Sequence, residues 1–167
     1  YYCWSDIENL RQKLLRSGEK IFVRDFGTGE DGIRRVADIA HTSLERPQLG
    51  QLLFRLLVYL RQQKQHPLAI LELGTSLGIT TSYLAMANSD NQVVTMEGST
   101  EIARIAQGNW EQLRVKNVTL VEGDIDTTLV RALDTLYNRA HTRRIDLAYV
   151  DANHTCEATC RYASLLL

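Results

Sequence analysis

Residues 70–85 have the sequence ILELGTSLGITTSYLA, in which two glycines separate an apolar stretch from a second one. The apolar run that ends at Leu73 is typical of a buried strand, and the residues after Gly78 favour a helix. Glycine at such a junction permits a positive φ and lets a ligand approach the backbone closely. The stretch therefore predicts a ligand-binding turn between a strand and a helix.

The alternation of apolar segments continues after this turn. Segments typical of strands are 68–73, 92–97, 117–122 and 145–151. Helix-like segments lie between and after them, at 80–87, 100–114, 127–138 and 155–166. Buried strands that alternate with helices are typical of a parallel sheet with helices packed on both faces. We therefore expect one α/β domain over residues 67–167.

The first 66 residues have a different pattern. Apolar residues at helical spacing predict helices over 4–17 and about 48–65, and Pro67 ends the second. Between them, residues 25–32 (DFGTGEDG) contain three glycines and three acids, which favours a mobile loop. We expect residues 1–66 to form a helical extension whose loop orders over bound ligands as a lid, and a plain connector is the alternative.

Composition excludes several classes of function. The net charge is −1, so no global electrostatic signal favours nucleic acid or anionic lipid as a partner. The longest apolar run of the N-terminal half, 52–60, is short and interrupted by Arg55, which predicts no membrane span. Three cysteines are an odd number and do not predict a disulfide framework, so we expect a cytoplasmic protein. The sequence does not predict an oligomeric state.

Four acids lie at or just after the ends of the predicted strands, namely Glu72, Glu97, Asp124 and Asp151. In an open parallel sheet, ligands bind outside the carboxyl ends of the strands, where the strand order switches. Acids also cap helices and interact with helix dipoles, which is the alternative for any one of them. All four together with the glycine turn favour a ligand with several hydrogen-bond donors.

The glycine turn excludes two common nucleotide sites. A dinucleotide fingerprint, G-x-G-x-x-G, fails because position 76 is Ser, and G-x-x-x-G-x-G fails because position 80 is Thr. A P-loop ends in Gly-Lys-Ser/Thr, whereas residues 78–80 are Gly-Ile-Thr. What remains is E-x-G-x-x-x-G, and an acid before the glycine favours an amino group over a phosphate. S-adenosylmethionine (SAM), which has a cationic amino-acid end and a nucleoside end, fits this pattern.

With this cofactor, Glu97 is positioned to accept hydrogen bonds from ribose hydroxyls, and Asp124 is positioned to meet the adenine amino group. The segments LELGTSLGITT, VVTMEGS, VEGDI and IDLAYVDANH, between Ile70 and His154, resemble the class I SAM-dependent methyltransferases. The last segment is similar to the small-molecule O-methyltransferase branch. The resemblance implies a Rossmann-like fold that binds SAM.

The resemblance also implies roles for individual residues. The methionine end of the cofactor is expected against Glu72, Gly74, Thr75, Ser76 and Gly78. Glu97 is implied to hold the ribose, and Asp124 with Ile125 the adenine. Family members have seven strands, whereas only four are predicted here, so we expect that the chain is a fragment without strands five to seven.

Asp151 and His154 form the pair that is placed to assist methyl transfer, and we expect them to be the catalytic residues. Asp151 is also the position of a divalent-metal ligand in the metal-dependent O-methyltransferases that the chain resembles, so a metal is an open alternative. The expected function is O-methylation of a small hydroxylated metabolite. The alternative is a non-catalytic module that keeps the nucleoside pocket.

Overall fold

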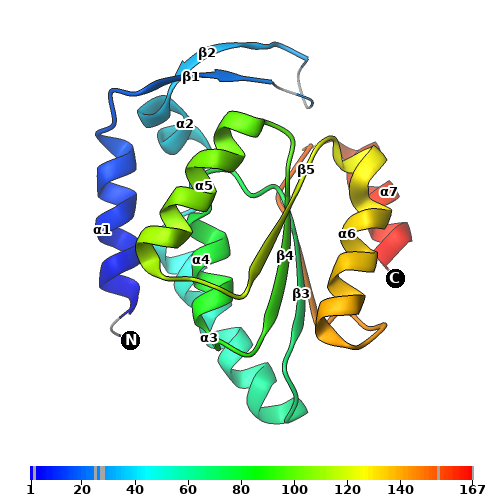
Figure 1. The fold of residues 1–167 in the computed structure, drawn as a ribbon. Coiled ribbons are helices and arrows are strands. Elements are labelled where there is room, and N and C mark those ends of the chain that lie inside the picture. Colours follow the sequence, from blue (N-terminus) through cyan, green and yellow to red (C-terminus); the bar gives the residue numbers. More distant parts are fainter. Residues whose placement is uncertain (2, 25, 27–28, 154, 167) are drawn as a thin grey trace.

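The computed structural model describes residues 1, 3–24, 26, 29–153 and 155–166. They form a four-stranded parallel sheet with helices on both faces and a separate two-stranded hairpin (Figure 1). The strands are β1 (Lys20–Val23), β2 (Gly32–Arg35), β3 (Ala69–Leu73), β4 (Gln92–Glu97), β5 (Val118–Glu122) and β6 (Leu147–Val150). The helices are α1 (Cys3–Leu15), α2 (Val36–Ser43), α3 (Pro47–Lys64), α4 (Ile79–Met86), α5 (Thr100–Leu113), α6 (Ile125–Ala140) and α7 (Cys156–Leu166).

The strand order of the parallel sheet is β5-β4-β3-β6. The chain moves outward from β3 through β4 to β5 and then returns to the other side of β3 with β6, where Leu73 is in register with Val150. The strand order therefore switches between β3 and β6, and their carboxyl ends border the crevice in which such sheets bind ligands. All five residues of β3 are buried, which makes this strand the centre of the fold.

Helices cover the two faces of the sheet separately, as Figure 1 shows with α3, α4 and α5 on one side and α6 and α7 on the other. On the first side, Leu53 and Leu57 of α3 pack with alternate residues of β3 and β4. On the second side, Leu129 and Leu136 of α6 and Tyr162 of α7 pack against other apolar residues of those strands. Burial of both faces explains the largely apolar sequences of the central strands β3 and β4. The predicted α/β, Rossmann-like class is confirmed.

The helices and strands predicted from residue 67 onward are all present, with ends shifted by a few residues. The N-terminal extension differs from the prediction, because it contains the antiparallel hairpin of β1 and β2 and the helix α2 besides α1 and α3. In β1, Ile21 and Val23 alternate with exposed residues and enter a core formed with α1, α2 and α4. The prediction of a loop over residues 25–32 is wrong at its end, where Gly32 begins β2. Residues 25, 27 and 28 of that loop lie outside the described part.

A buried carboxylate connects α3 to the sheet. The side chain of Asp146, at the start of β6, is only 3% exposed. It accepts hydrogen bonds from the backbone N–H of Ala69 at 2.8 Å and from Lys64 Nζ at 2.5 Å. The contact joins residues that are 77 and 82 positions away along the chain. It therefore fixes the end of α3 and the starts of β3 and β6 in one place.

We expect Asp146→Ala to lower the free energy of unfolding by about 1–3 kcal/mol, because the buried N–H of Ala69 loses its acceptor. Chemical denaturation followed by circular dichroism measures this change. Asp134→Ala on the exposed side of α6 is the matched control and is expected to stay within about 0.5 kcal/mol. Equal stability of the two variants would show that the carboxylate contributes nothing beyond surface charge.

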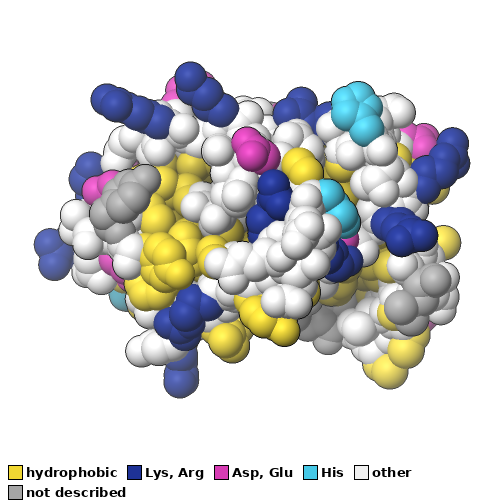
Figure 2. Space-filling model, turned by 90° about the horizontal axis from the view of Figure 1, so that it is seen from below, with side chains coloured by type: hydrophobic (Ala, Val, Ile, Leu, Met, Phe, Trp, Pro, Cys, Tyr) yellow, Lys and Arg dark blue, Asp and Glu magenta, His cyan; other side chains and the backbone are white. Residues whose placement is uncertain are grey.

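The surface at the end of the molecule opposite the hairpin includes hydrophobic side chains. Figure 2 shows hydrophobic side chains gathered on one side of this end, with Lys and Arg side chains around them. Exposed hydrophobic residues of the N-terminal segment include Tyr1, Leu52, Leu56 and Tyr59. No helix formed by the described residues is both long enough and apolar enough to span a membrane.

Candidate functional site

A cavity of about 1480 Å³ lies at the carboxyl ends of the parallel strands, where the strand order switches. Its floor comes from the residues that follow β3, β4, β5 and β6, and its opposite wall comes from the hairpin, α2 and the connection to α3. The lining includes six of the predicted site residues, namely Gly74, Ser76, Glu97, Asp124, Ile125 and Asp151. The fold therefore brings together residues that lie up to 77 positions apart in the sequence.

The glycine turn after β3 has the backbone conformation that its sequence favours. Gly74 has a φ of 97° and Gly78 a φ of 76°, both in the region where residues with a Cβ are strained. A Cβ on Gly74 would lie 2.2 Å from the backbone oxygen of Asp151. Gly74 therefore allows the ends of β3 and β6 to approach each other at the switch point.

Gly78 has a packing role rather than a place in the cavity lining. A Cβ there would lie 2.7 Å from Nε1 of Trp110, and that nitrogen donates a hydrogen bond to the Gly78 carbonyl at 3.0 Å. Gly78 is also the N-cap of α4. The second glycine therefore lets α5 pack against the turn, and its predicted contact with the cofactor stays a prediction.

Glu97, the last residue of β4, organises the turn from the neighbouring strand. Its Oε2 accepts a hydrogen bond from the backbone N–H of Ser76 at 2.9 Å, and its Oε1 accepts one from Ser99 N–H at 2.9 Å. The Ser76 hydroxyl lies 2.7 Å from the hydroxyl of Ser43, the last residue of α2. The Glu97 carboxylate thus orients the turn and is itself held at the cavity. The contact between Ser43 and Ser76 joins α2 to the same network.

Glu72 is completely buried in β3 and is not among the residues that line the cavity. Its Oε2 accepts hydrogen bonds from Thr81 Oγ1 at 2.5 Å and Thr95 Oγ1 at 2.6 Å, and Thr95 also contacts the buried hydroxyl of Thr75 at 2.6 Å. Its Oε1 has no hydrogen-bond partner among the described residues. Burial raises the pKa of Glu72 to about 8, so the carboxyl is mostly protonated at neutral pH. The predicted roles of Glu72 and Thr75 toward the cofactor stay predictions.

A buried acid with a raised pKa makes stability depend on pH. The folded state keeps a proton on Glu72 that the unfolded chain releases near pH 4.5, so the contribution of this group to stability falls as the pH rises from about 4.5 to about 8. The slope is at most about 1.4 kcal/mol per pH unit. Urea denaturation across this range should show that Glu72→Gln, which cannot titrate, loses less stability than the wild type. If the stability of the two proteins changed equally with pH, a proton held on Glu72 would be contradicted.

Asp124 and Ile125 begin α6 at another part of the cavity. The Asp124 side chain caps the helix by accepting the N–H of Asp126 at 3.1 Å. Tyr162 of α7, which the sequence did not single out, also lines the cavity here. Asp124 therefore has a capping role, as the alternative for strand-end acids predicts, and also lies where the nucleoside end of a cofactor was predicted.

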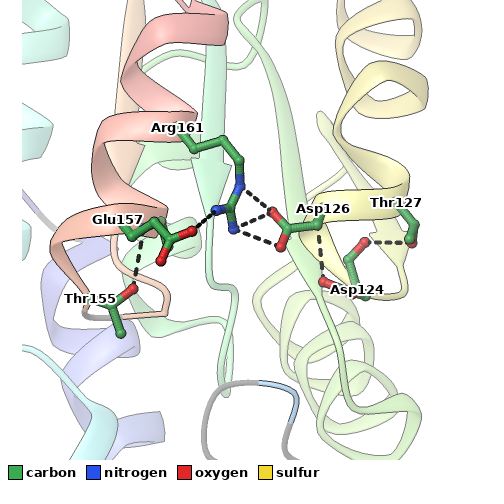
Figure 3. Close-up of polar contacts among 7 residues, drawn as sticks. Asp124, Asp126, Thr127, Thr155, Glu157 and Arg161 are labelled. Carbon is green, nitrogen blue, oxygen red and sulfur yellow. Dashed lines mark hydrogen bonds and ion pairs between the residues drawn. The ribbon is translucent and has the colours of Figure 1, made fainter.

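An ion pair between α6 and α7 supports this part of the site (Figure 3). Arg161 of α7 contacts both carboxylate oxygens of Asp126, at 2.9 Å and 2.7 Å, and lies 3.7 Å from Glu157. Thr155, which lines the cavity, accepts the N–H of Ala158 at 3.2 Å near the start of α7. Both partners of the main pair are about two-fifths exposed, so solvent screens the pair and its contribution to stability is small. The pair positions α7 beside Asp124 and Ile125.

Asp151 lines the cavity directly after β6. The hydroxyl of Tyr149 lies 3.5 Å from its Oδ2, and burial together with the charge of Asp151 raises the pKa of that tyrosine. His154, the second predicted catalytic residue, lies outside the described residues. Within the described ranges, no group of three His, Cys, Asp or Glu side chains is arranged to hold a metal ion. The described donors therefore do not fit a metal held by this part of the chain alone.

The hairpin contributes a contact that sequence reasoning missed. The ring of Phe26 lies against Gly98, so that a Cβ on this glycine would be 2.6 Å from the ring. Both residues line the cavity. An aromatic residue inside a glycine-rich, acidic loop was a signal that could have indicated a docking side chain. The contact joins the hairpin to the residue after Glu97.

Comparison with known proteins identifies the family of the chain. The family model described as a methyltransferase domain matches residues 71–167. The chain belongs to this methyltransferase domain family. The matched region runs from within β3 to the end of α7 and contains all of the strand-end residues described above. No curated protein sequence matches the chain.

Solved structures of methyltransferases share the fold of this methyltransferase domain. The O-methyltransferase TomG from Streptomyces achromogenes, which is involved in tomaymycin synthesis and was crystallised with SAM, is 27% identical with a TM-score of 0.61, over 74% of this chain and 52% of TomG. A putative O-methyltransferase from Klebsiella pneumoniae is 27% identical with a TM-score of 0.54, over 75% of this chain and 53% of its own. The O-methyltransferase from Bacillus cereus in complex with SAH, at 20% identity and a TM-score of 0.65, shares the fold over 99% of this chain and 61% of its own. The chain thus spans about half to three-fifths of the lengths of these proteins.

Proposed function

We propose that the protein is a SAM-dependent methyltransferase that methylates an oxygen of a small hydroxylated metabolite. The observation that supports this most is the cavity at the switch point, which places Gly74 and Ser76, Glu97, and Asp124 with Ile125 along one wall. These are the groups expected for the methionine, ribose and adenine parts of the cofactor, in that order. Two of the O-methyltransferases with the same fold were crystallised with SAM or SAH.

The residues of the cavity fit this cofactor chemically. Ser76 lines the cavity in a turn that glycines open, with its N–H held by Glu97 and its hydroxyl by Ser43, and this polar surface suits the methionine end. The Glu97 carboxylate accepts hydrogen bonds, as ribose hydroxyls require. Ile125 and Tyr162 provide apolar surface for a base, with Asp124 as an acceptor beside them. When bound, SAM supplies a methyl group on a positively charged sulfur.

The chain then has two tasks in the reaction. The cavity aligns an acceptor hydroxyl with the methyl group, so that its oxygen forms the new C–O bond while the C–S bond breaks and its electron pair stays on the sulfur. The hydroxyl proton passes to a base, and Asp151, which lines the cavity after β6, is proposed as this base. His154 is proposed as its partner in this role.

Transfer of a labelled methyl group tests the proposal. The protein is incubated with methyl-labelled SAM and a set of hydroxylated aromatic acceptors, and the products are separated and analysed by mass spectrometry. We expect label in an O-methylated product and a loss of at least about 100-fold in rate in Asp151→Asn, the lower range for general-base catalysis. SAM binding without any transfer would instead support the non-catalytic module.

A further inference from the structure

The cavity is larger than a single ligand needs. Its volume of about 1480 Å³ exceeds the roughly 300–1,000 Å³ of ordinary small-molecule pockets, so it has room for a cofactor and a second molecule. Under the proposed function, the cofactor binds the residues that follow β3, β4, β5 and β6, which form the strand-end wall. The opposite wall, built from the hairpin, α2 and the α2–α3 connection, is therefore the surface that a second molecule would meet.

The strand-end wall is acidic. Its carboxylates are Glu97, Asp124 and Asp151, and the described lining residues from Gly74 onward include no Lys or Arg. Such a wall suits hydroxyl, amino and sulfonium groups, all of which donate hydrogen bonds or carry positive charge. It is unfavourable for an anion, because like charges repel across a partly enclosed cavity where solvent screening is reduced.

The opposite wall is basic. Among the described residues it contributes five cations to the lining, namely Lys20, Arg24, Arg34, Arg35 and Arg46. Its described carboxylates are Asp38 and Glu45. Arg35 holds Asp38 through two hydrogen bonds of 2.9 Å and 2.7 Å, which leaves an excess of positive charge on this wall.

Two of these cations are well placed to meet a ligand. The guanidinium of Arg24 lies 5.2 Å from the centre of the Phe26 ring, and Phe26 in turn rests on Gly98 beside Glu97. Arg46 precedes α3 and follows Ser43, whose hydroxyl contacts Ser76 of the glycine turn. Arg24 and Arg46 are thus both near residues that contact the strand-end side of the cavity. The guanidinium fork matches the geometry of carboxylate and phosphate groups.

We infer that the methyl acceptor is an anion, a hydroxylated small molecule whose carboxylate or phosphate group binds the basic wall. This inference rests on the proposed function and adds the chemical class of the acceptor. The two walls orient such a molecule, because its anionic group is attracted to Arg24 and Arg46 while its hydroxyl group faces Asp151 and the methyl group. A neutral analogue of the same shape lacks this attraction.

The test compares matched pairs of acceptor probes on the protein saturated with SAH. Protocatechuate and its neutral carboxamide form one pair, and 4-hydroxyphenyl phosphate and hydroquinone form the other, so that the two pairs separate carboxylate from phosphate. Isothermal titration calorimetry first measures SAH binding and then the affinity of each probe. We expect at least one anion to bind about 10-fold or more tightly than its neutral partner, with the preference reduced about 10-fold in the double variant Arg24→Ala/Arg46→Ala.

Arg143→Ala is the matched control, because it removes an exposed arginine from the α6–β6 connection, outside this cavity. It should leave both SAH binding and the preference for the anion unchanged. Equal affinity within both pairs, no binding by either anion, or a preference that the double variant keeps would each overturn the inference. If SAH itself fails to bind, the proposed function fails first, and that result is distinguishable from a protein that binds SAH but does not discriminate between the probes.

Discussion

Gly74→Ala is expected to lower the free energy of unfolding by about 3 kcal/mol or more. The added methyl group meets the backbone oxygen of Asp151 at 2.2 Å, and backbone cannot move aside as a flexible side chain can. Overpacking costs about 1–3 kcal/mol, and the φ of 97° adds strain of about 1–3 kcal/mol for a residue with a Cβ. Thermal unfolding should show a fall in midpoint of roughly 6–12 °C for a chain of this size.

Gly108→Ala in α5 is the control for this prediction. A Cβ at Gly108 meets no atom within 4 Å, and alanine is the better residue in a helix. We expect it to be neutral or to stabilise the protein by up to about 1 kcal/mol. If Gly74→Ala behaved like Gly108→Ala, the ends of β3 and β6 would not approach each other as described.

Glu97→Ala is expected to weaken SAM binding by about 10- to 150-fold. A hydrogen bond to a charged acceptor contributes about 1.5–3 kcal/mol, and the ribose is proposed to bind this carboxylate. The loss includes the effect on the turn, because the N–H groups of Ser76 and Ser99 also bond to Glu97. Calorimetric titration with SAM measures the change in dissociation constant, and circular dichroism verifies that the variant folds.

Glu122→Ala is the matched control, since Glu122 ends the neighbouring strand β5 at the equivalent place but does not line the cavity. Its SAM affinity should equal that of the wild type. An unchanged affinity of Glu97→Ala would mean that this acid only orients the turn and does not contact the cofactor.

The strands and the acids at their ends were predictable because their signals are local. Continuous apolar runs indicate buried parallel strands, and the position of Glu97 or Asp151 follows from where each run ends. The hairpin was missed because β2 lacks such a local signal. β2 (GIRR) has no alternation of apolar and polar residues, and its one large apolar side chain, Ile33, is exposed.

The interior of the site was less predictable, because it depends on contacts between distant residues. Glu72 was predicted to meet the amino group of the cofactor, whereas its hydroxyl partners, Thr81 and Thr95, are 9 and 23 positions away. The sequence does not indicate that these three side chains share a buried network, nor that burial raises the pKa of the acid although the two threonines bond to it. The location of Arg24 and Arg46 on one cavity wall likewise depends on how the hairpin folds back over the sheet.

Titration of the protein with SAM, SAH, NAD and ATP under identical conditions tests the central claim most directly. The glycine turn and the wall formed by Glu97, Asp124 and Asp151 favour a ligand with a cationic amino-acid end and no phosphate. We therefore predict that SAM and SAH bind, and that NAD and ATP bind the cofactor position far more weakly because their phosphates would meet this acidic wall. Tight binding of NAD with no response to SAM or SAH would contradict the proposed function.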